Sequence, residues 1–177
     1  GDDEFGAEAR AALAREGVGT DVLVTLDHTA TGVALILVDA KAENQIAVAP
    51  GANAGLTAAH VRQALGRLNP HAGDAVIVTH EIPTAAAREA LRIGRQGGAW
   101  TILNPAPAAA LSDEMLSLCD YLTPNESEAE LLTGLPVTNL EQAKAAAEAL
   151  LKRGVGAVIL TLGANGVLYH DGKQTLH

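Results

Sequence analysis

The sequence has little cysteine, few aromatic residues and no long hydrophobic run. Its 177 residues include one Cys, and aromatic residues make up only 2%. One cysteine cannot form an internal disulfide, and no Cys and His cluster has zinc-site spacing, so a reducing compartment, the cytosol, is expected. No apolar run approaches the roughly 18 residues that cross a bilayer, and the first residues lack the basic and apolar regions of a signal peptide. Neither secretion nor contact with a membrane has support.

Basic residues are also scarce. There are 12 Lys and Arg against 21 Asp and Glu, which gives a formal charge of −9, and no run of Lys or Arg could neutralise a phosphate backbone. Nucleic acid is therefore not an expected partner. A small anionic ligand is still compatible with this charge, because phosphates are usually held by backbone N–H groups and one or two local cations.

Small and aliphatic residues are abundant. Hydrophobic residues make up 48% of the chain and Gly contributes 18 residues, enough for the core of one domain or of a large piece of one. The chain begins without Met in a helix-start pattern and stops at His177 just after one arm of a hairpin. These ends predict that the sequence is an excerpt from a longer protein.

Two types of pattern follow one another along the chain. The first part predicts a helix over residues 3–15, a strand over 22–26, and a hairpin of strands 31–38 and 45–49 joined by the polar loop 39–44. The second part alternates helices and strands, which is typical of a mostly parallel sheet with helices on both faces. Its predicted helices cover 57–68, 84–96, 113–119, 126–133 and 140–153, and its predicted strands cover 75–79, 100–103, 121–122 and 157–162. The fold class is α/β.

In such a sheet, ligands bind beyond the carboxyl ends of the strands. Four loops follow predicted strands, at residues 80–83, 104–107, 123–128 and 163–166, and all of them carry polar residues, Gly or Pro. Because these loops would meet at one edge of the sheet, their composition indicates a ligand site there.

The segment Thr123–Glu128 has two interpretations. Asn125 or Ser127 could simply cap the helix that follows, and acidic residues in its first turn would complement the helix dipole. On physical grounds alone, the capping interpretation is favoured. The alternative rests on the spacing of Asn125 and Glu128, which places an amide and a carboxylate one turn apart, able to address a nucleotide phosphate and its hydrated Mg²⁺.

Two further segments leave alternatives open. Thr161–Gly166 fits a plain turn or a nucleotide-binding loop with exposed N–H groups, but it is neither a Walker A sequence nor a dinucleotide fingerprint. Glu81 is either a solvated loop residue or an acceptor for sugar hydroxyls. His80 is expected to be structural, and without a Ser-His-Asp arrangement a hydrolase has no support. Cys119 is expected in the core.

Six segments in the same order resemble the ribokinase (phosphofructokinase-B) family of sugar kinases, and the match covers nearly the whole chain. They are Gly1–Gly6, Thr31–Gly32, Pro50–Ala54, Asn104–Ala108, Thr123–Glu128 and Thr161–Gly163. The resemblance implies a three-layer α/β/α sandwich with a small β-hairpin lid. It divides the chain into a core helix (1–19), the lid segment (20–49) and an α/β nucleotide- and sugar-binding core (50–177).

The resemblance also implies an activity, transfer of the γ-phosphoryl group of ATP to a sugar hydroxymethyl group. Glu81 matches an acidic residue that binds sugar hydroxyls in ribokinases, which favours ribose over fructose or adenosine. Ile36 and Val48 would be lid residues over the sugar, and Glu128 would act near Mg²⁺, through water. The expected ATP-binding residues are Asn125, Thr161, Leu162, Gly163, Ala164, Asn165 and Gly166. The resemblance also implies pairing of lids in a homodimer.

Two motifs of the family are absent from the sequence. They are the early Gly-Gly-Asn sugar-binding motif and the late Gly-Ala-Gly-Asp motif, which carries the anion hole and the Asp base. No catalytic residue is therefore matched, and these 177 residues alone are expected to be inactive, since a base must reach the attacking hydroxyl. The monovalent cation site, for K⁺, would also lie outside the sequence. The alternatives are a fructokinase, deoxyribokinase or nucleoside kinase, or a non-catalytic protein that binds a sugar or nucleotide.

Overall fold

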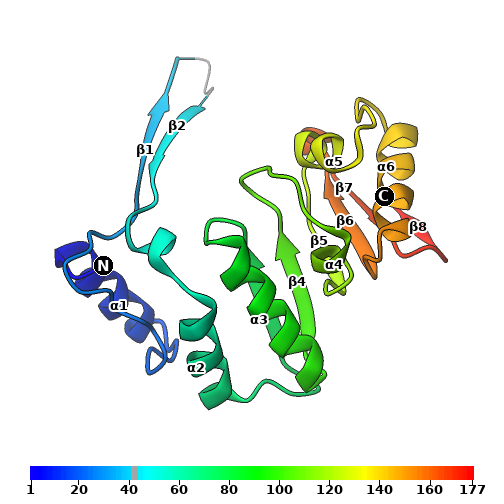
Figure 1. Cartoon of the computed structure of the whole chain (residues 1–177). Coiled ribbons are helices and arrows are strands. Elements are labelled where there is room, and N and C mark those ends of the chain that lie inside the picture. The colour runs from blue at the N-terminus through cyan, green and yellow to red at the C-terminus, as the bar shows by residue number, and fades with distance from the viewer. Residues whose placement is uncertain (41–43) are drawn as a thin grey trace.

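The computed structural model describes residues 1–40 and 44–177 and shows a β-hairpin set apart from a larger α/β unit (Figure 1). The α-helices are α1 (Glu4–Arg15), α2 (Ala58–Leu68), α3 (Thr84–Gly97), α4 (Asp113–Leu116), α5 (Glu126–Thr133) and α6 (Leu140–Lys152). The strands are β1 (Val33–Val38), β2 (Asn44–Ala49), β3 (Ala75–Thr79), β4 (Trp100–Asn104), β5 (Tyr121–Leu122), β6 (Ala157–Thr161), β7 (Val167–His170) and β8 (Thr175–Leu176). Two short 3₁₀ helices, η1 (Gly51–Gly55) and η2 (Gly163–Asn165), complete the elements.

The strands form two separate sheets. β1 and β2 make a two-stranded antiparallel sheet, whereas β3 to β8 make a six-stranded sheet in sequence order. β3, β4, β5 and β6 are parallel, β7 pairs antiparallel with β6, and β8 pairs antiparallel with β7. The parallel strands place their carboxyl ends at one edge, as a helix separates each from the next. The α/β class is confirmed.

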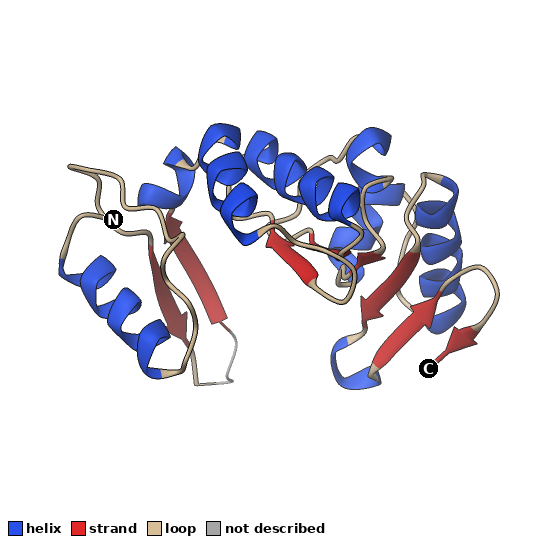
Figure 2. Ribbon diagram, turned by 90° about the horizontal axis from the view of Figure 1, so that it is seen from below, coloured by secondary structure: helices blue, strands red, loops and turns tan. Residues whose placement is uncertain are grey.

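The core lies between one face of the six-stranded sheet and its helices. In β3 the exposed and buried residues alternate, and buried Val76 and Val78 face the helices, with α3 on this side of the strands (Figure 2). A Cβ atom on Gly94 of α3 would lie 2.8 Å from Val76 Cγ2, so glycine permits the close approach of helix and sheet. On the opposite face, Ile77 and Trp100 are exposed. The described residues thus cover the sheet with helices on one side.

The first turn of α1 is joined to the start of the hairpin. Asp3 caps the helix by accepting the N–H of Gly6 at 2.9 Å, and it also accepts the N–H of Thr31 at 2.8 Å and the Thr31 hydroxyl. The bonds from Thr31 and then Gly6 lower the Asp3 pKa to about 2. Two segments of the family resemblance, Gly1–Gly6 and Thr31–Gly32, are therefore one structural unit.

The predicted strand Val22–Leu26 is wrong. This segment is an irregular loop without a pairing strand among residues 1–40 and 44–177. Arg10 of α1 donates to the carbonyl oxygens of Thr20 and Leu23, both at 3.1 Å, and to the Thr25 hydroxyl at 3.0 Å. β-propensity alone does not make a strand, because the backbone needs a neighbouring ladder.

The other predicted elements form with small shifts at their ends. The helix predicted over 113–119 is shorter, since α4 ends at Leu116 and a turn follows to Cys119. Part of the predicted hairpin loop, residues 41–43, lies outside the described residues. In the part of the chain that is described, no helix combines the length and hydrophobicity needed to span a membrane.

Candidate functional site

The four loops singled out by sequence meet at the carboxyl edge of the sheet. Backbone hydrogen bonds continue the ladder from one loop to the next. The His80 N–H donates to Asn104 O at 3.0 Å, the Thr123 N–H to Leu103 O at 2.9 Å, and the Thr161 N–H to Pro124 O at 2.9 Å. The edge therefore holds the predicted sugar residue and the predicted nucleotide segments in one fixed row.

Asn125 and Glu128 form a reciprocal cap at the start of α5. The Glu128 N–H donates to Asn125 Oδ1 at 2.8 Å, and the Asn125 N–H donates back to Glu128 Oε2 at 2.9 Å. In addition, Asn125 Nδ2 donates to Glu128 Oε1 at 3.1 Å. Glu128 is only 6% exposed, whereas Asn125 is exposed. The capping interpretation is correct, and it fixes the orientation of both side chains.

The cap leaves the Glu128 carboxylate able to accept further hydrogen bonds. Each oxygen of Glu128 accepts one bond from Asn125 and keeps further acceptor capacity. Mg²⁺ in nucleotide sites is bound through one or two carboxylates, phosphates and several retained waters. No group of three or more His, Cys, Asp or Glu that could ligate a metal is found among the described residues. A single anchored carboxylate fits a role toward hydrated Mg²⁺ that a nucleotide brings with it, rather than a protein-made metal cage.

The segment Thr161–Gly166 forms a compact turn between β6 and β7. The Leu162 N–H donates to Gly166 O at 2.8 Å, and Gly163 and Gly166 have φ values of 53° and 88°, which favour glycine. Leu162 is buried, whereas Thr161 and residues 163–166 are exposed. An isolated parallel bridge pairs Thr161 with Asn125. The turn is thus exposed on the surface and joined by this bridge to the Asn125–Glu128 cap.

Glu81 lies in the turn between β3 and α3, and its side chain is exposed. Its neighbour His80 is half-buried, with Nε2 3.1 Å from the Thr84 hydroxyl at the start of α3. This contact supports the structural role expected for His80. Exposure leaves the Glu81 carboxylate free to accept hydrogen bonds from a ligand.

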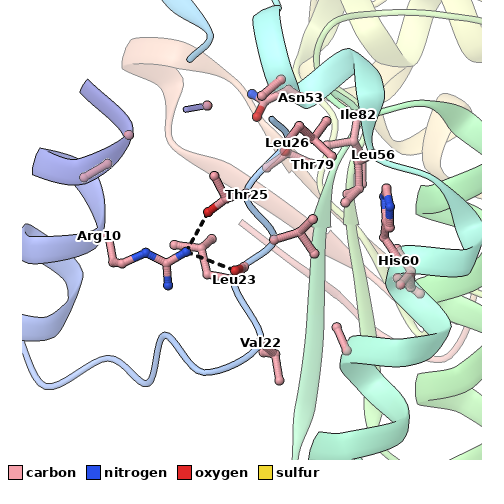
Figure 3. A pocket seen from close by; sticks show the side chains of 18 of the residues that line it. Arg10, Val22, Leu23, Thr25, Leu26, Asn53, Leu56, His60, Thr79 and Ile82 are labelled. Atoms are coloured by element: carbon pink, nitrogen blue, oxygen red, sulfur yellow. Dashed lines mark hydrogen bonds between the residues drawn. The ribbon is translucent and has the colours of Figure 1, made fainter. Parts of the chain in front are cut away.

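A mostly apolar pocket of 540 Å³ reaches this edge from the side of α1 and α2 (Figure 3). Thr79 and Ile82, on either side of the Glu81 turn, line one end, and Asn53 of η1 lines it as well. Arg10 lines the opposite wall, but its bonds to the loop 20–25 hold it there. The volume is that of a small-molecule site. Glu81, Ile36 and Val48 are not among the lining residues.

Ile36 and Val48 lie on the same face of the β1–β2 sheet. The register pairs Ala34 with Val48 and Ile36 with Ile46, so the two side chains are diagonal neighbours. Both are more than half exposed, at 58% and 63%. The hairpin therefore brings the two predicted lid residues together on one apolar surface.

Sequence analysis gave no individual role to three polar residues at the same edge, Thr79, Asn104 and Thr123, although it singled out the loops that begin at Asn104 and Thr123. Each ends or follows a buried strand, and Asn104 is part of β4 although the predicted strand stopped one residue earlier. The sequence signal that could have identified these residues is a polar residue at the end of an apolar strand. Cys119, in contrast, is fully buried as expected, and burial first and Asp120 second raise its thiol pKa to about 12.

The family assignment follows from comparison with known proteins. The family model described as "pfkB family carbohydrate kinase" matches residues 1–177, the whole sequence. The chain belongs to the pfkB family of carbohydrate kinases.

Its relatives include ribokinases from distant organisms. The chain is 40% identical to the ribokinase of Haemophilus influenzae over 167 residues, which cover 94% of the chain and 54% of the relative. It is 32% identical to the deoxyribokinase of Salmonella typhi, and the match covers 100% of the chain and 58% of the relative. The structure of Arabidopsis thaliana ribokinase complexed with ribose and ATP superimposes with a TM-score of 0.83 at 26% identity, over 100% of the chain and 58% of that structure. The chain spans a little more than half the length of these relatives, and the ribokinase-like fold is confirmed.

Proposed function

We propose that the protein is an ATP-dependent kinase that phosphorylates D-ribose at its 5-hydroxyl. The observation that carries this proposal is the single sheet edge that holds the Glu81 turn, the Asn125–Glu128 cap and the Thr161–Gly166 turn in a row. Relatives named ribokinase at 40% identity support the choice of ribose. The products are ADP and ribose 5-phosphate.

Each of the edge segments has a role in this proposal. Glu81 accepts hydrogen bonds from sugar hydroxyls, and Ile36 and Val48 cover the sugar as part of the lid segment 20–49. Asn125 and the turn from Thr161 to Gly166 bind ATP. Phosphoryl transfer is catalysed mainly by positioning and by charge stabilisation, which fits side chains that are fixed by a cap and by tight turns. The proton of the attacking hydroxyl goes to a base that none of the matched segments supplies.

Two cations belong to the proposal. Mg²⁺ enters with ATP and neutralises charge on its phosphates, and Glu128 holds its hydration shell from the anchored position described above. A monovalent cation, K⁺, is expected as an activator from the family resemblance, with its ligands outside residues 1–177. The proposed location is the cytosol, which agrees with a single, buried and unreactive thiol.

The hairpin also supports a homodimer in which two lids pair. Both of its faces are apolar and exposed, with Leu35 and Leu37 on one face and Ile36 and Val48 on the other. A lid that covers sugar with one face leaves the second face exposed, and a second copy of the hairpin is the proposed cover.

A deoxyribokinase is the second candidate, favoured by the relative of that name at 32% identity over 100% of the chain. The two functions differ in one hydroxyl of the sugar. A site that hydrogen-bonds this hydroxyl discriminates strongly against a sugar that lacks it.

A substrate comparison tests the function. The purified full-length protein is assayed with ATP and Mg²⁺ on D-ribose, 2-deoxy-D-ribose, D-fructose and adenosine, with ADP release as the readout. We expect the highest kcat/KM for D-ribose. A higher kcat/KM for 2-deoxy-D-ribose would replace ribose by deoxyribose, and no phosphorylation of any of the four would contradict a sugar kinase.

A further inference from the structure

Three polar side chains form a row across the carboxyl edge of the sheet. Thr79 of β3 pairs in register with Asn104 of β4, and the Thr123 N–H continues the ladder to Leu103. In each strand the preceding residue is buried against the helices, so these three side chains lie on the opposite face. Below them the same face carries apolar Ile77 and Ile102. The row therefore marks where an apolar sheet face becomes polar.

The amide of Asn104 is held in place by one of its two ends. Asn104 Oδ1 accepts the N–H of Ala106 at 3.1 Å, which closes a turn at the start of the loop after β4. Pro105, between them, is fully buried. Asn104 Nδ2, in contrast, donates to no acceptor among residues 1–40 and 44–177, although the side chain is half-buried. An amide fixed through its oxygen and open at its nitrogen is a preorganised hydrogen-bond donor.

The place of this donor suits a hydroxyl ligand. On one side, Asn104 O accepts the N–H of His80, which is next to Glu81. On the other side, Thr123 leads to Asn125 and the nucleotide segments. A sugar hydroxyl both donates and accepts, so it needs an acceptor such as the Glu81 carboxylate and a donor nearby. The edge supplies no cationic side chain in this row, which favours a neutral polyol over a phosphate.

We propose that Asn104 Nδ2 donates a hydrogen bond to a sugar hydroxyl and that Asn104 is a sugar-binding residue of the enzyme. The inference rests on the proposed function, because it assigns a contact for the same substrate. It adds a donor to a site for which the sequence supplied only the carboxylate of Glu81 and the apolar lid residues.

Two substitutions separate binding from the turn that Asn104 closes. Asn104→Asp and Asn104→Ser both keep an oxygen that can accept the Ala106 N–H, and both remove the Nδ2 donor. Asn69→Asp is the matched control. It is the same chemical change, but it lies at the carboxyl end of α2, before β3 begins. The full-length variants are compared by thermal unfolding, by D-ribose binding in calorimetry without nucleotide, and by the KM for ATP.

We expect both Asn104 variants to bind D-ribose about tenfold more weakly, the effect of one lost hydrogen bond, with a KM for ATP within about twofold of that of the unsubstituted protein. Unchanged ribose binding in both would overturn the inference. So would a change confined to ATP, which would make the ligand a phosphate, or loss of the fold in both variants, which would make the amide purely structural. If the unsubstituted protein binds and phosphorylates no sugar, the proposed function itself fails, and the inference fails with it.

Discussion

At the scale of single residues, the atoms that form the Asn125–Glu128 cap are the same atoms to which we assign the proposed functional role. Capping explains why Glu128 is buried and yet satisfied, since Asn125 donates to both of its oxygens. It also means that a substitution at Glu128 changes the helix start together with any effect on a ligand. The role proposed toward Mg²⁺ must therefore be tested with a variant that keeps the cap.

Glu128→Gln keeps the backbone part of the cap. The Gln carbonyl can still accept the Asn125 N–H, whereas the bond from Asn125 Nδ2 is lost, so we expect the unfolding midpoint to fall by a few degrees without loss of the fold. Loss of the charge should raise the Mg²⁺ concentration needed for half-maximal activity and lower kcat by about tenfold or more. Initial rates across a Mg²⁺ titration measure both. Glu130→Gln, at an exposed position of the same helix, is the control. A Mg²⁺ dependence equal to that of the control would show that Glu128 only caps the helix.

Glu81→Gln tests the sugar site. The exposed Glu81 carboxylate makes no hydrogen bond or ion pair with the residues that the structure describes, so the unfolding midpoint should not change. We expect the KM for D-ribose to rise about tenfold or more, because a charged acceptor is replaced by a neutral amide, while the KM for ATP stays within about twofold. Glu114→Gln, at an exposed position on α4, is the matched control. An unchanged KM for ribose would remove Glu81 from the sugar site.

At the scale of elements, an ion pair joins α2 and α3. Glu89 Oε1 of α3 lies 3.1 Å from Arg62 Nη1 of α2 and 2.8 Å from Arg92 Nη2 of its own helix. The bond from Arg92, and then that from Arg62, lower the Glu89 pKa to about 2 from an ordinary 4.5. A carboxyl with a lowered pKa stabilises the fold above its unfolded pKa, and this contribution is lost as the pH falls toward the folded pKa.

We therefore expect Glu89→Gln to lower the unfolding midpoint by a few degrees at pH 7. The difference from the unsubstituted protein should shrink between about pH 4.5 and pH 2, because both proteins then carry a neutral side chain at this position. Calorimetric unfolding over this pH range measures it. The same difference for Glu114→Gln should be small at every pH, since the Arg88–Glu114 pair is well exposed. A constant difference from pH 7 to pH 2 would show that the charge of Glu89 contributes nothing.

Elements whose pattern is local were predictable from the sequence, and those that depend on partners were not. The alternation between Thr57 and Thr161 depends on neighbouring residues, so the order of helices and strands in that stretch is correct, whereas β7 and β8 were not among the predicted strands. The strand at Val22–Leu26 failed because no ladder is present beside it. In the site, the cap at Asn125 was readable from spacing, whereas the Asn104 amide needed the register of β4 against β3.

At the scale of the whole molecule, the hairpin is the least covered part of the described chain. It extends away from the six-stranded sheet beside α1 and η1 (Figure 1). Leu35 and Leu37 on one face are 69% and 70% exposed, and Ile36, Ile46 and Val48 on the other are 58%, 52% and 63% exposed. Isolated hairpins are only marginally stable in water. A two-stranded sheet with two apolar faces is therefore expected to pack against a ligand or another protein surface on each face. In the proposed function, sugar covers one face and a second subunit covers the other.

Substitutions on the two faces should then have different effects. Leu37→Glu places a charge in the proposed interface between subunits, so we expect the mass from light scattering at micromolar concentration to fall from dimer to monomer. Ile36→Glu should instead raise the KM for D-ribose and leave the dimer mass unchanged. Leu68→Glu, at an exposed leucine that ends α2, is the control for charge on an apolar surface. If the unsubstituted protein is a monomer, or if Leu37→Glu remains a dimer, the hairpin does not form the interface, and its second face must be covered by something other than a second subunit.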